Sequence, residues 1–227
     1  MKKMMRRIAV YNHKGGIGKT TIAVHLAYYA EELKIRTFAT CIDPQGDLWR
    51  WLSGGDAIQT DEAVFERGSL TAVYARGVVP DFRDDVAELM IVDCSPDIEL
   101  SLILKPHLWV VPVHGRMGFE NMTSVIEDLR SVGDVLVVCN SVGRGGRRAM
   151  KDLRHALSCI KGLKVAETEL IESDTITRSG ELYRPVCDIP YANRSRAPGI
   201  MKKLCREVFK TAKVPLSPRG PQLVVED

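Results

Sequence analysis

The chain has 227 residues, of which 45% are hydrophobic and 27% are charged. This length can bury enough apolar surface for one compact domain, and the charged fraction argues against disorder. No apolar run reaches the roughly 18 residues that a membrane-spanning helix needs, and the basic start at residues 1–7 lacks the apolar core of a secretory signal. We therefore expect a soluble, cytoplasmic protein with no stable membrane insertion.

Charge is distributed unevenly along the chain, although the net value is only +3. Sixteen basic residues stand against eight acidic ones between residues 144 and 213, and the remainder is mildly acidic. This asymmetry indicates either an anionic partner, such as nucleic acid or a membrane surface, or ordinary solvated helix faces. The six cysteines form no C-x-x-C pair, so we expect buried thiols and neither disulfides nor a zinc or iron–sulfur site.

Short apolar runs rich in β-branched residues alternate with longer helical patterns, which is typical of a mostly parallel, twisted sheet with helices on both faces. We predict strands at residues 8–11, 37–42, 89–93, 109–113 and 135–140, with a weaker one at 163–168. Helices are predicted at residues 19–33, 121–131, 149–160 and 200–212. The pattern indicates one α/β domain at residues 1–213 and a Pro-containing C-terminal tail at residues 214–227.

The strongest signal lies between the first strand and the first helix, where the chain reads Asn12-His13-Lys14-Gly15-Gly16-Ile17-Gly18-Lys19-Thr20-Thr21. Glycines let successive N–H groups turn toward phosphates, and the helix that follows adds the positive end of its dipole. Lys19 would contact the β- and γ-phosphates, and Thr20 would offer its hydroxyl to Mg²⁺. We therefore predict a single P-loop NTPase domain whose nucleotide is bound by Lys14, Gly15, Gly16, Ile17, Gly18, Lys19, Thr20 and Thr21.

A second lysine, Lys14, opens this loop, and His13 stands where the usual pattern has its first glycine. The stretch resembles the deviant Walker A motif of the ParA/MinD family of P-loop ATPases. In that family the extra lysine reaches across an ATP-dependent sandwich dimer to the phosphates of the partner subunit's ATP. The resemblance covers residues 6–213, and it implies an ATPase that uses ATP and Mg²⁺, forms a homodimer, and has Lys14 and Lys19 among its catalytic residues.

The second predicted strand leads into Asp43-Pro44-Gln45-Gly46-Asp47, which resembles the switch I segment of the same family. Asp43 matches the aspartate that orients or activates the attacking water, so the resemblance implies a catalytic role for it. Cys41 replaces the first aspartate of the family pattern, and Asp47 replaces the usual asparagine. Without the family, the segment is simply a turn after a strand. Residues 49–83 contain no motif.

Two further polar residues follow predicted strands. Asp93 ends an apolar run in the manner of a Walker B strand, where a carboxylate reaches Mg²⁺ directly or through water. Asn140 matches a family asparagine at the nucleotide base, a role that suits an amide because it both donates and accepts. A turn-forming asparagine is the alternative. We therefore expect Thr20 and Asp93 at a Mg²⁺ site and Asn140 at the base.

Members of this family bind a surface as ATP dimers and leave it on hydrolysis. The surface is DNA in the ParA branch and a membrane in the MinD branch, which uses an amphipathic C-terminal helix. Prolines and acidic residues at the end of this chain oppose such a helix. The last predicted helix instead carries basic residues on the side away from its apolar stripe, where they could contact phosphates without reading sequence; a solvated helix face is the alternative. The candidates are Arg194, Arg196, Lys202, Lys203, Arg206 and Lys210.

We therefore expect a ParA-like ATPase that binds DNA nonspecifically as an ATP dimer and partitions a plasmid, a chromosome or other cargo. The resemblance also implies an adaptor of the ParB type and association with the nucleoid in the ATP-bound form. Two alternatives stay open, a MinD-like membrane-associated positioning ATPase and a metabolic P-loop enzyme. Binding to anionic liposomes would favour the first of these.

Overall fold

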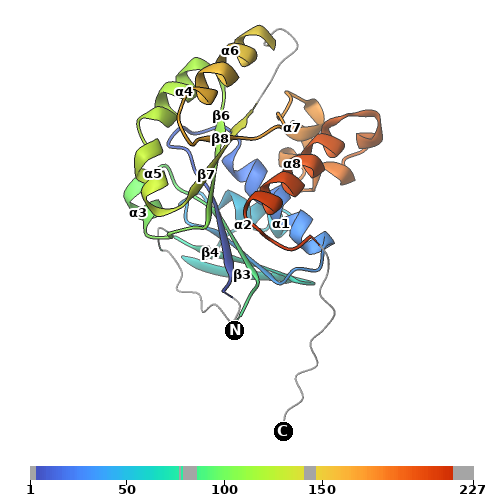
Figure 1. The fold of residues 1–227 in the computed structure, drawn as a ribbon. Coiled ribbons are helices and arrows are strands. Elements are labelled where there is room, and N and C mark those ends of the chain that lie inside the picture. Colours follow the sequence, from blue (N-terminus) through green and yellow to red (C-terminus); the bar gives the residue numbers. More distant parts are fainter. Residues whose placement is uncertain (1–3, 77, 79–85, 141–146, 217–227) are drawn as a thin grey trace.

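A twisted eight-stranded sheet forms the centre of the protein in the computed structural model, which describes residues 4–76, 78, 86–140 and 147–216 (Figure 1). The strand order is β3-β4-β2-β5-β1-β6-β7-β8, and only β3 runs antiparallel to its neighbour. The strands are β1 (Arg6–Val10), β2 (Thr37–Cys41), β3 (Glu62–Arg67), β4 (Leu70–Ala75), β5 (Leu89–Asp93), β6 (Leu108–Val113), β7 (Asp134–Cys139) and β8 (Lys164–Val165).

Helices cover both faces of the sheet, as the sequence predicts. One face carries α1 (Lys19–Glu32), α2 (Asp47–Leu52), α7 (Asp174–Glu181) and α8 (Ala197–Thr211). The other carries α3 (Ile98–Leu102), α4 (Gly115–Thr123), α5 (Ile126–Val132) and α6 (Arg147–Ser158). Two short 3₁₀ helices, η1 (Val186–Asp188) and η2 (Ala192–Arg194), lead into α8. The predicted α/β architecture is therefore confirmed.

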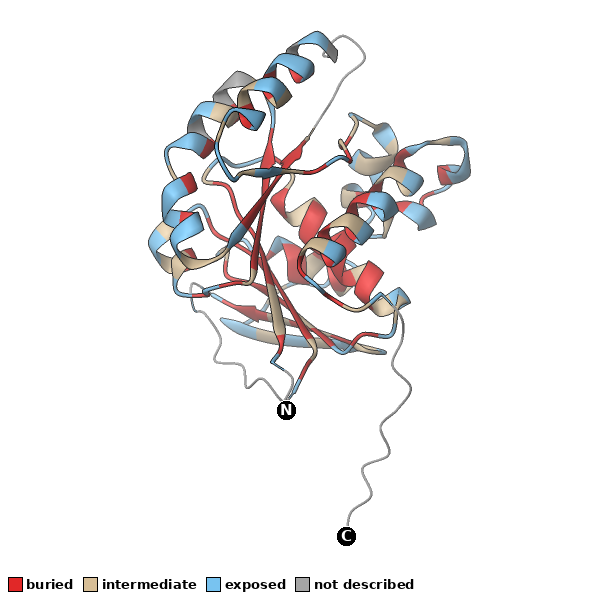
Figure 2. Ribbon diagram, in the orientation of Figure 1, coloured by how far each residue is buried: buried red, intermediate tan, exposed pale blue. Residues whose placement is uncertain are grey.

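The central strands are buried on both faces, which explains why they appear in the sequence as continuous apolar runs (Figure 2). Alternate side chains of β1 divide between two cores. Ile8 and Val10 pack in the cluster that contains α1 and α8, whereas Ala9 packs in the cluster that contains α4, α5 and α6. The strands therefore hold their carboxyl ends rigidly at one edge of the sheet, where an open parallel sheet places its ligand.

Three predictions about the elements need correction. The predicted helix at residues 121–131 is two helices, because Thr123, Ser124 and Val125 favour helix weakly and Val125 N–H donates to Met122 O in a tight turn (3.1 Å). The weak strand at residues 163–168 contains only β8. The sequence analysis also missed the β3–β4 hairpin, α2, α3 and α7.

The end of the domain lies close to its predicted boundary. Val214, assigned to the tail, is 4% exposed and packs in the core with α1 and α8. The rest of the predicted tail, at residues 217–227, lies outside the described residues. Across the described ranges, no helix is both long enough and apolar enough to cross a membrane.

Candidate functional site

The predicted phosphate loop joins β1 to α1 at the carboxyl edge of the sheet. Gly16 and Gly18 have φ angles of 69° and 89°, which L side chains rarely adopt, and Gly18 caps the start of α1. The Lys19 side chain is 8% exposed, and its ammonium donates to Lys14 O across the loop (3.1 Å). Lys14, Gly15 and Gly16 are exposed. The loop thus combines a nearly buried cation with an accessible one.

Asn12 organises the start of this loop and was not among the predicted site residues. It is 1% exposed; its amide donates to Pro112 O of β6, and its carbonyl oxygen accepts from Lys14 N–H (both 2.9 Å). The second bond is an Asx turn, which asparagine forms readily. Its position two residues before Lys14 is a signal that sequence reasoning could have used.

Thr20 and Asp93 lie together below the loop, as predicted. The Thr20 hydroxyl donates to Asp93 Oδ2 (2.7 Å), whereas the buried Oδ1 has no hydrogen-bond partner in the described chain. Burial raises the pKa of Asp93 to about 7, against opposing effects of Thr20 and Lys19. A hydroxyl and a carboxylate oxygen with spare acceptor capacity are donors that Mg²⁺ takes, together with waters and phosphate oxygens. These residues therefore fit the predicted cation.

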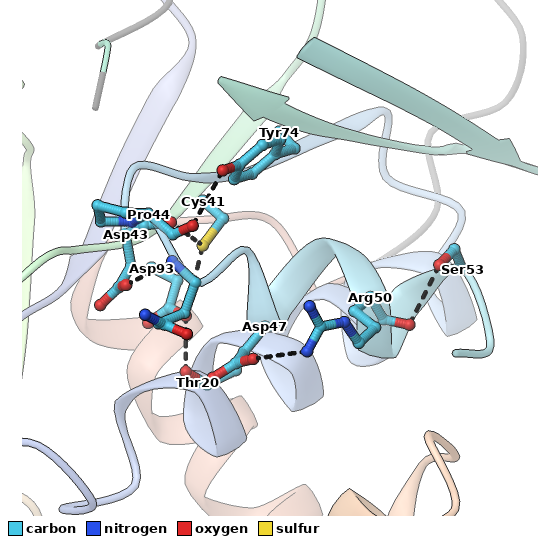
Figure 3. A network of polar contacts seen from close by, with 10 residues as sticks. Thr20, Cys41, Asp43, Pro44, Asp47, Arg50, Ser53, Tyr74 and Asp93 are labelled. Atoms are coloured by element: carbon cyan, nitrogen blue, oxygen red, sulfur yellow. Dashed lines mark hydrogen bonds and ion pairs between the residues drawn. The ribbon is translucent and has the colours of Figure 1, made fainter. Parts of the chain in front are cut away.

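Asp43 lies at the end of β2 in a tight turn that leads to α2. Its carboxylate accepts from Gln45 N–H (2.9 Å), and its backbone carbonyl accepts from Gly46 N–H (3.0 Å). Asp93 is in register with Cys41, two residues before Asp43. The fold thus brings the switch I match and the Walker B match to neighbouring strand ends (Figure 3). The catalytic roles of Asp43, Lys14 and Lys19 stay predictions.

Asn140 lies against the phosphate loop itself. Its amide donates to Ile17 O (2.7 Å), and a Cβ added at Gly18 would lie 2.5 Å from Asn140 Nδ2. The residue follows β7, which the sheet places next to β6. This contact joins the strand end to the loop, and the predicted contact with a nucleotide base stays a prediction.

The basic candidates form an exposed surface, here called the basic face, on η2, α8 and their connection: Arg194, Arg196, Lys202, Lys203, Arg206 and Lys210. Some of this charge is engaged within the protein. Lys202 pairs with Glu32 at the end of α1, and the guanidinium of Arg194 lies over the Tyr191 ring, 5.0 Å from its centroid. The apolar stripe of α8 is buried as predicted, with Ile200 partly exposed.

Comparison with known proteins identifies relatives over most of the chain. A model of the CobQ/CobB/MinD/ParA nucleotide binding domain matches residues 8–186. The chromosome-partitioning ATPase Soj of Thermus thermophilus is 47% identical over 65 residues, which are 29% of this chain and 24% of that protein. A putative replication protein A of Rhizobium rhizogenes is 26% identical over 147 residues, 60% of this chain and 34% of that protein. The matches thus span about a quarter and a third of these relatives.

Solved structures share the fold at low sequence identity. An McdA–ATP complex of Cyanothece superposes with a TM-score of 0.73 at 14% identity, covering 94% of this chain and 98% of that one. The septum site-determining protein MinD of Pyrococcus horikoshii, complexed with Mg-ADP, gives a TM-score of 0.63 at 18% identity, covering 93% of this chain and 98% of that one. The agreement over nearly the whole of both chains confirms the predicted P-loop NTPase fold.

Proposed function

This chain belongs to the CobQ/CobB/MinD/ParA family of nucleotide-binding domains, and we propose that it is a ParA-like ATPase that binds DNA nonspecifically as an ATP dimer. On this proposal, ATP hydrolysis releases the dimer and so drives partitioning of a plasmid, a chromosome or other cargo, with an adaptor of the ParB type. The segment of 47% identity to the partition ATPase Soj favours this branch of the family. We propose a cytoplasmic protein that joins the nucleoid when ATP is bound.

The observation that carries the ATPase proposal is the phosphate loop with Thr20 and Asp93 beneath it. Loop N–H groups and Lys19 would hold the phosphates, and Thr20 and Asp93 would hold Mg²⁺. Bound Mg²⁺ supplies positive charge that stabilises the transferring phosphoryl group. Asp43 would orient the attacking water, and Asn140 would contact the base. These residues come from separate strand ends, so the sheet preorganises the site before nucleotide binds.

Exposure of Lys14 supports the proposed dimer. Its side chain is in solvent, and its backbone is fixed by Asn12 and Lys19. A fixed but accessible lysine can reach phosphates of a second subunit and stabilise charge that develops during transfer. Activity would then depend on dimerisation, which couples hydrolysis to the assembled state.

The basic face supports the proposed DNA contact. It lies near the end of α1 that is remote from the phosphate loop, because Lys202 pairs with Glu32. From Lys19 to Glu32 the helix extends about 20 Å at 1.5 Å per residue. ATP therefore cannot touch DNA contacts on this face directly. Pairing two basic faces in an ATP dimer would instead increase the number of phosphate contacts.

Light scattering and DNA binding with ATP·Mg²⁺, ADP·Mg²⁺ and no nucleotide would test the proposal. We expect a dimer with ATP only, tighter DNA binding by that dimer, and an affinity that falls steeply with salt. Equal DNA binding with both nucleotides, or binding that ignores salt, would refute the DNA proposal. Sedimentation with anionic liposomes in place of DNA would point instead to the MinD-like alternative.

A further inference from the structure

Three side chains form one row across the sheet, from its edge hairpin to the cation site. Tyr74 in β4 is in register with Cys41 in β2, and Cys41 is in register with Asp93 in β5. Neighbouring residues in register project from the same face of a sheet. The row ends in a strand that belongs to residues 49–83, where the sequence contains no motif. The edge hairpin therefore reaches the functional site through Tyr74.

Two members of this row hold the turn that carries Asp43 (Figure 3). The Tyr74 hydroxyl donates to Pro44 O (3.0 Å), and the Cys41 thiol donates to Asp43 O (3.5 Å). Tyr74 is 3% exposed, so water competes poorly for its hydroxyl. Consecutive carbonyls of the turn are thus anchored to two different strands.

Packing at Gly46 closes the turn from the same side. Its φ angle is 66°, and an added Cβ would lie 2.2 Å from Ile58 Cδ1 and 3.0 Å from the Tyr74 ring. No side chain fits between the turn and the ring. The Tyr74 ring is therefore a wall for the turn, and its hydroxyl is an anchor for the backbone beside Asp43.

We propose that Tyr74 is a positioning residue for hydrolysis, which aims the Asp43 carboxylate by fixing the Asp43–Pro44 backbone. The inference rests on the proposed function, in which Asp43 orients the attacking water. Tyr74 does not contact the nucleotide in this scheme. Its loss should therefore slow turnover and leave ATP affinity unchanged, because small displacements of a catalytic group reduce rate much more than binding.

Tyr74→Phe tests the anchor, since it removes only the hydroxyl. With ATP·Mg²⁺ we expect kcat to fall about tenfold, with the Kd for ATP changed less than about twofold. In an Asp43→Ala background, the same substitution should cause no further loss, because the group being aimed is absent. Tyr29→Phe is the matched control: Tyr29 is also a nearly buried tyrosine, but it packs against Phe209 of α8. Assays without DNA should show normal kcat for it.

The outcomes separate this inference from the proposed function. If Asp43→Ala is slow and Tyr74→Phe has normal kcat, or if the two losses multiply in the double variant, Tyr74 does not act through Asp43. If Asp43→Ala hydrolyses ATP normally, the proposed role of Asp43 fails instead. Hydrogen exchange gives a readout besides activity. The Gly46 amide, which donates to Asp43 O, should exchange faster in Tyr74→Phe; unchanged protection there would overturn the anchor.

Discussion

A single carboxyl shows how this site is poised for a cation. Asp93 is 1% exposed, and one of its oxygens has no hydrogen-bond partner in the described chain. A buried, incompletely satisfied carboxylate lowers the stability of the folded protein, because its charge has left water. A divalent cation beside Thr20 and Asp93 would offset this cost. The residue thus favours ligand binding at the expense of the stability of the free protein.

Lys14 gives a test of the proposed dimer at one residue. Lys14→Ala should leave ATP binding by the monomer within about threefold of wild type, because Lys19 and the loop N–H groups remain. The ATP-dependent dimer should be lost, since the exposed ammonium is the group proposed to reach the partner's phosphates. Light scattering with ATP measures this change. Lys161→Ala, which removes another exposed lysine, is the control, and an undiminished Lys14→Ala dimer would contradict the role.

Gly18 tests the contact between the loop and Asn140. Gly18→Ala would place a methyl group 2.5 Å from Asn140 Nδ2 at a φ angle of 89°, so the loop must shift. We expect the Kd for ATP to rise at least about tenfold, which corresponds to about 1.4 kcal/mol. Gly199→Ala is the matched control, because a Cβ there meets no atom within 4 Å. Isothermal titration of both variants decides, and wild-type affinity for Gly18→Ala would show that the contact is dispensable.

The helix α1 joins the phosphate loop to the C-terminal elements. Its residue His25 is buried and neutral: Nδ1 donates to Thr21 O (2.7 Å), and Nε2 accepts from Val186 N–H of η1 (3.0 Å). Trp51 and Tyr28 contact the ring edge-on, with centroids 5.7 and 6.2 Å away. A protonated ring could not accept from Val186, so this link requires neutral His25.

The pKa of His25 predicts how stability depends on pH. Burial lowers it to about 4, only partly opposed by the hydrogen bond to Thr21, whereas the unfolded chain has the ordinary value of about 6.5. Between these values the unfolded chain binds more protons, so stability falls as the pH falls. From pH 7 to pH 5 the wild type should lose about 2 kcal/mol relative to His25→Gln. Urea unfolding measures this, and the exposed His155→Gln should follow wild type; parallel pH curves for wild type and His25→Gln would refute the assignment.

Elements with one clear periodicity were predictable, and those that depend on pairing were not. The strands β1, β5 and β7 are buried on both faces and form apolar runs. The edge strand β3 instead alternates exposed and half-buried residues, including Glu62 and Glu66, which resembles a loop. Gly68-Ser69, between two alternating runs, was the available signal for a hairpin. The position of Tyr74 beside the turn depends on the β2–β4 register, which the sequence does not specify.

At the scale of the whole molecule, nucleotide and basic face are at opposite ends of α1, in one rigid core. Phe209 of α8 packs against Tyr29 of α1 with ring centroids 5.3 Å apart, so α8 is fixed relative to the helix that begins at the phosphate loop. A dimer that forms around ATP would therefore bring two basic faces into a defined relation. The salt dependence of DNA binding then reports how many phosphates the pair neutralises.

Charge reversal on this face tests that relation. Lys203 and Lys210 are exposed on α8, and Lys203→Glu with Lys210→Glu should weaken DNA binding by the ATP form at every sequence. If both lysines contact phosphates, the slope of log K against log salt should fall by about 0.9 for each lysine lost per subunit. Lys151→Glu with Lys161→Glu changes the net charge equally on the other side of the sheet. An equal loss in that control would mean that overall charge, and not α8, attracts DNA; unchanged binding in the first pair would remove α8 from the interface.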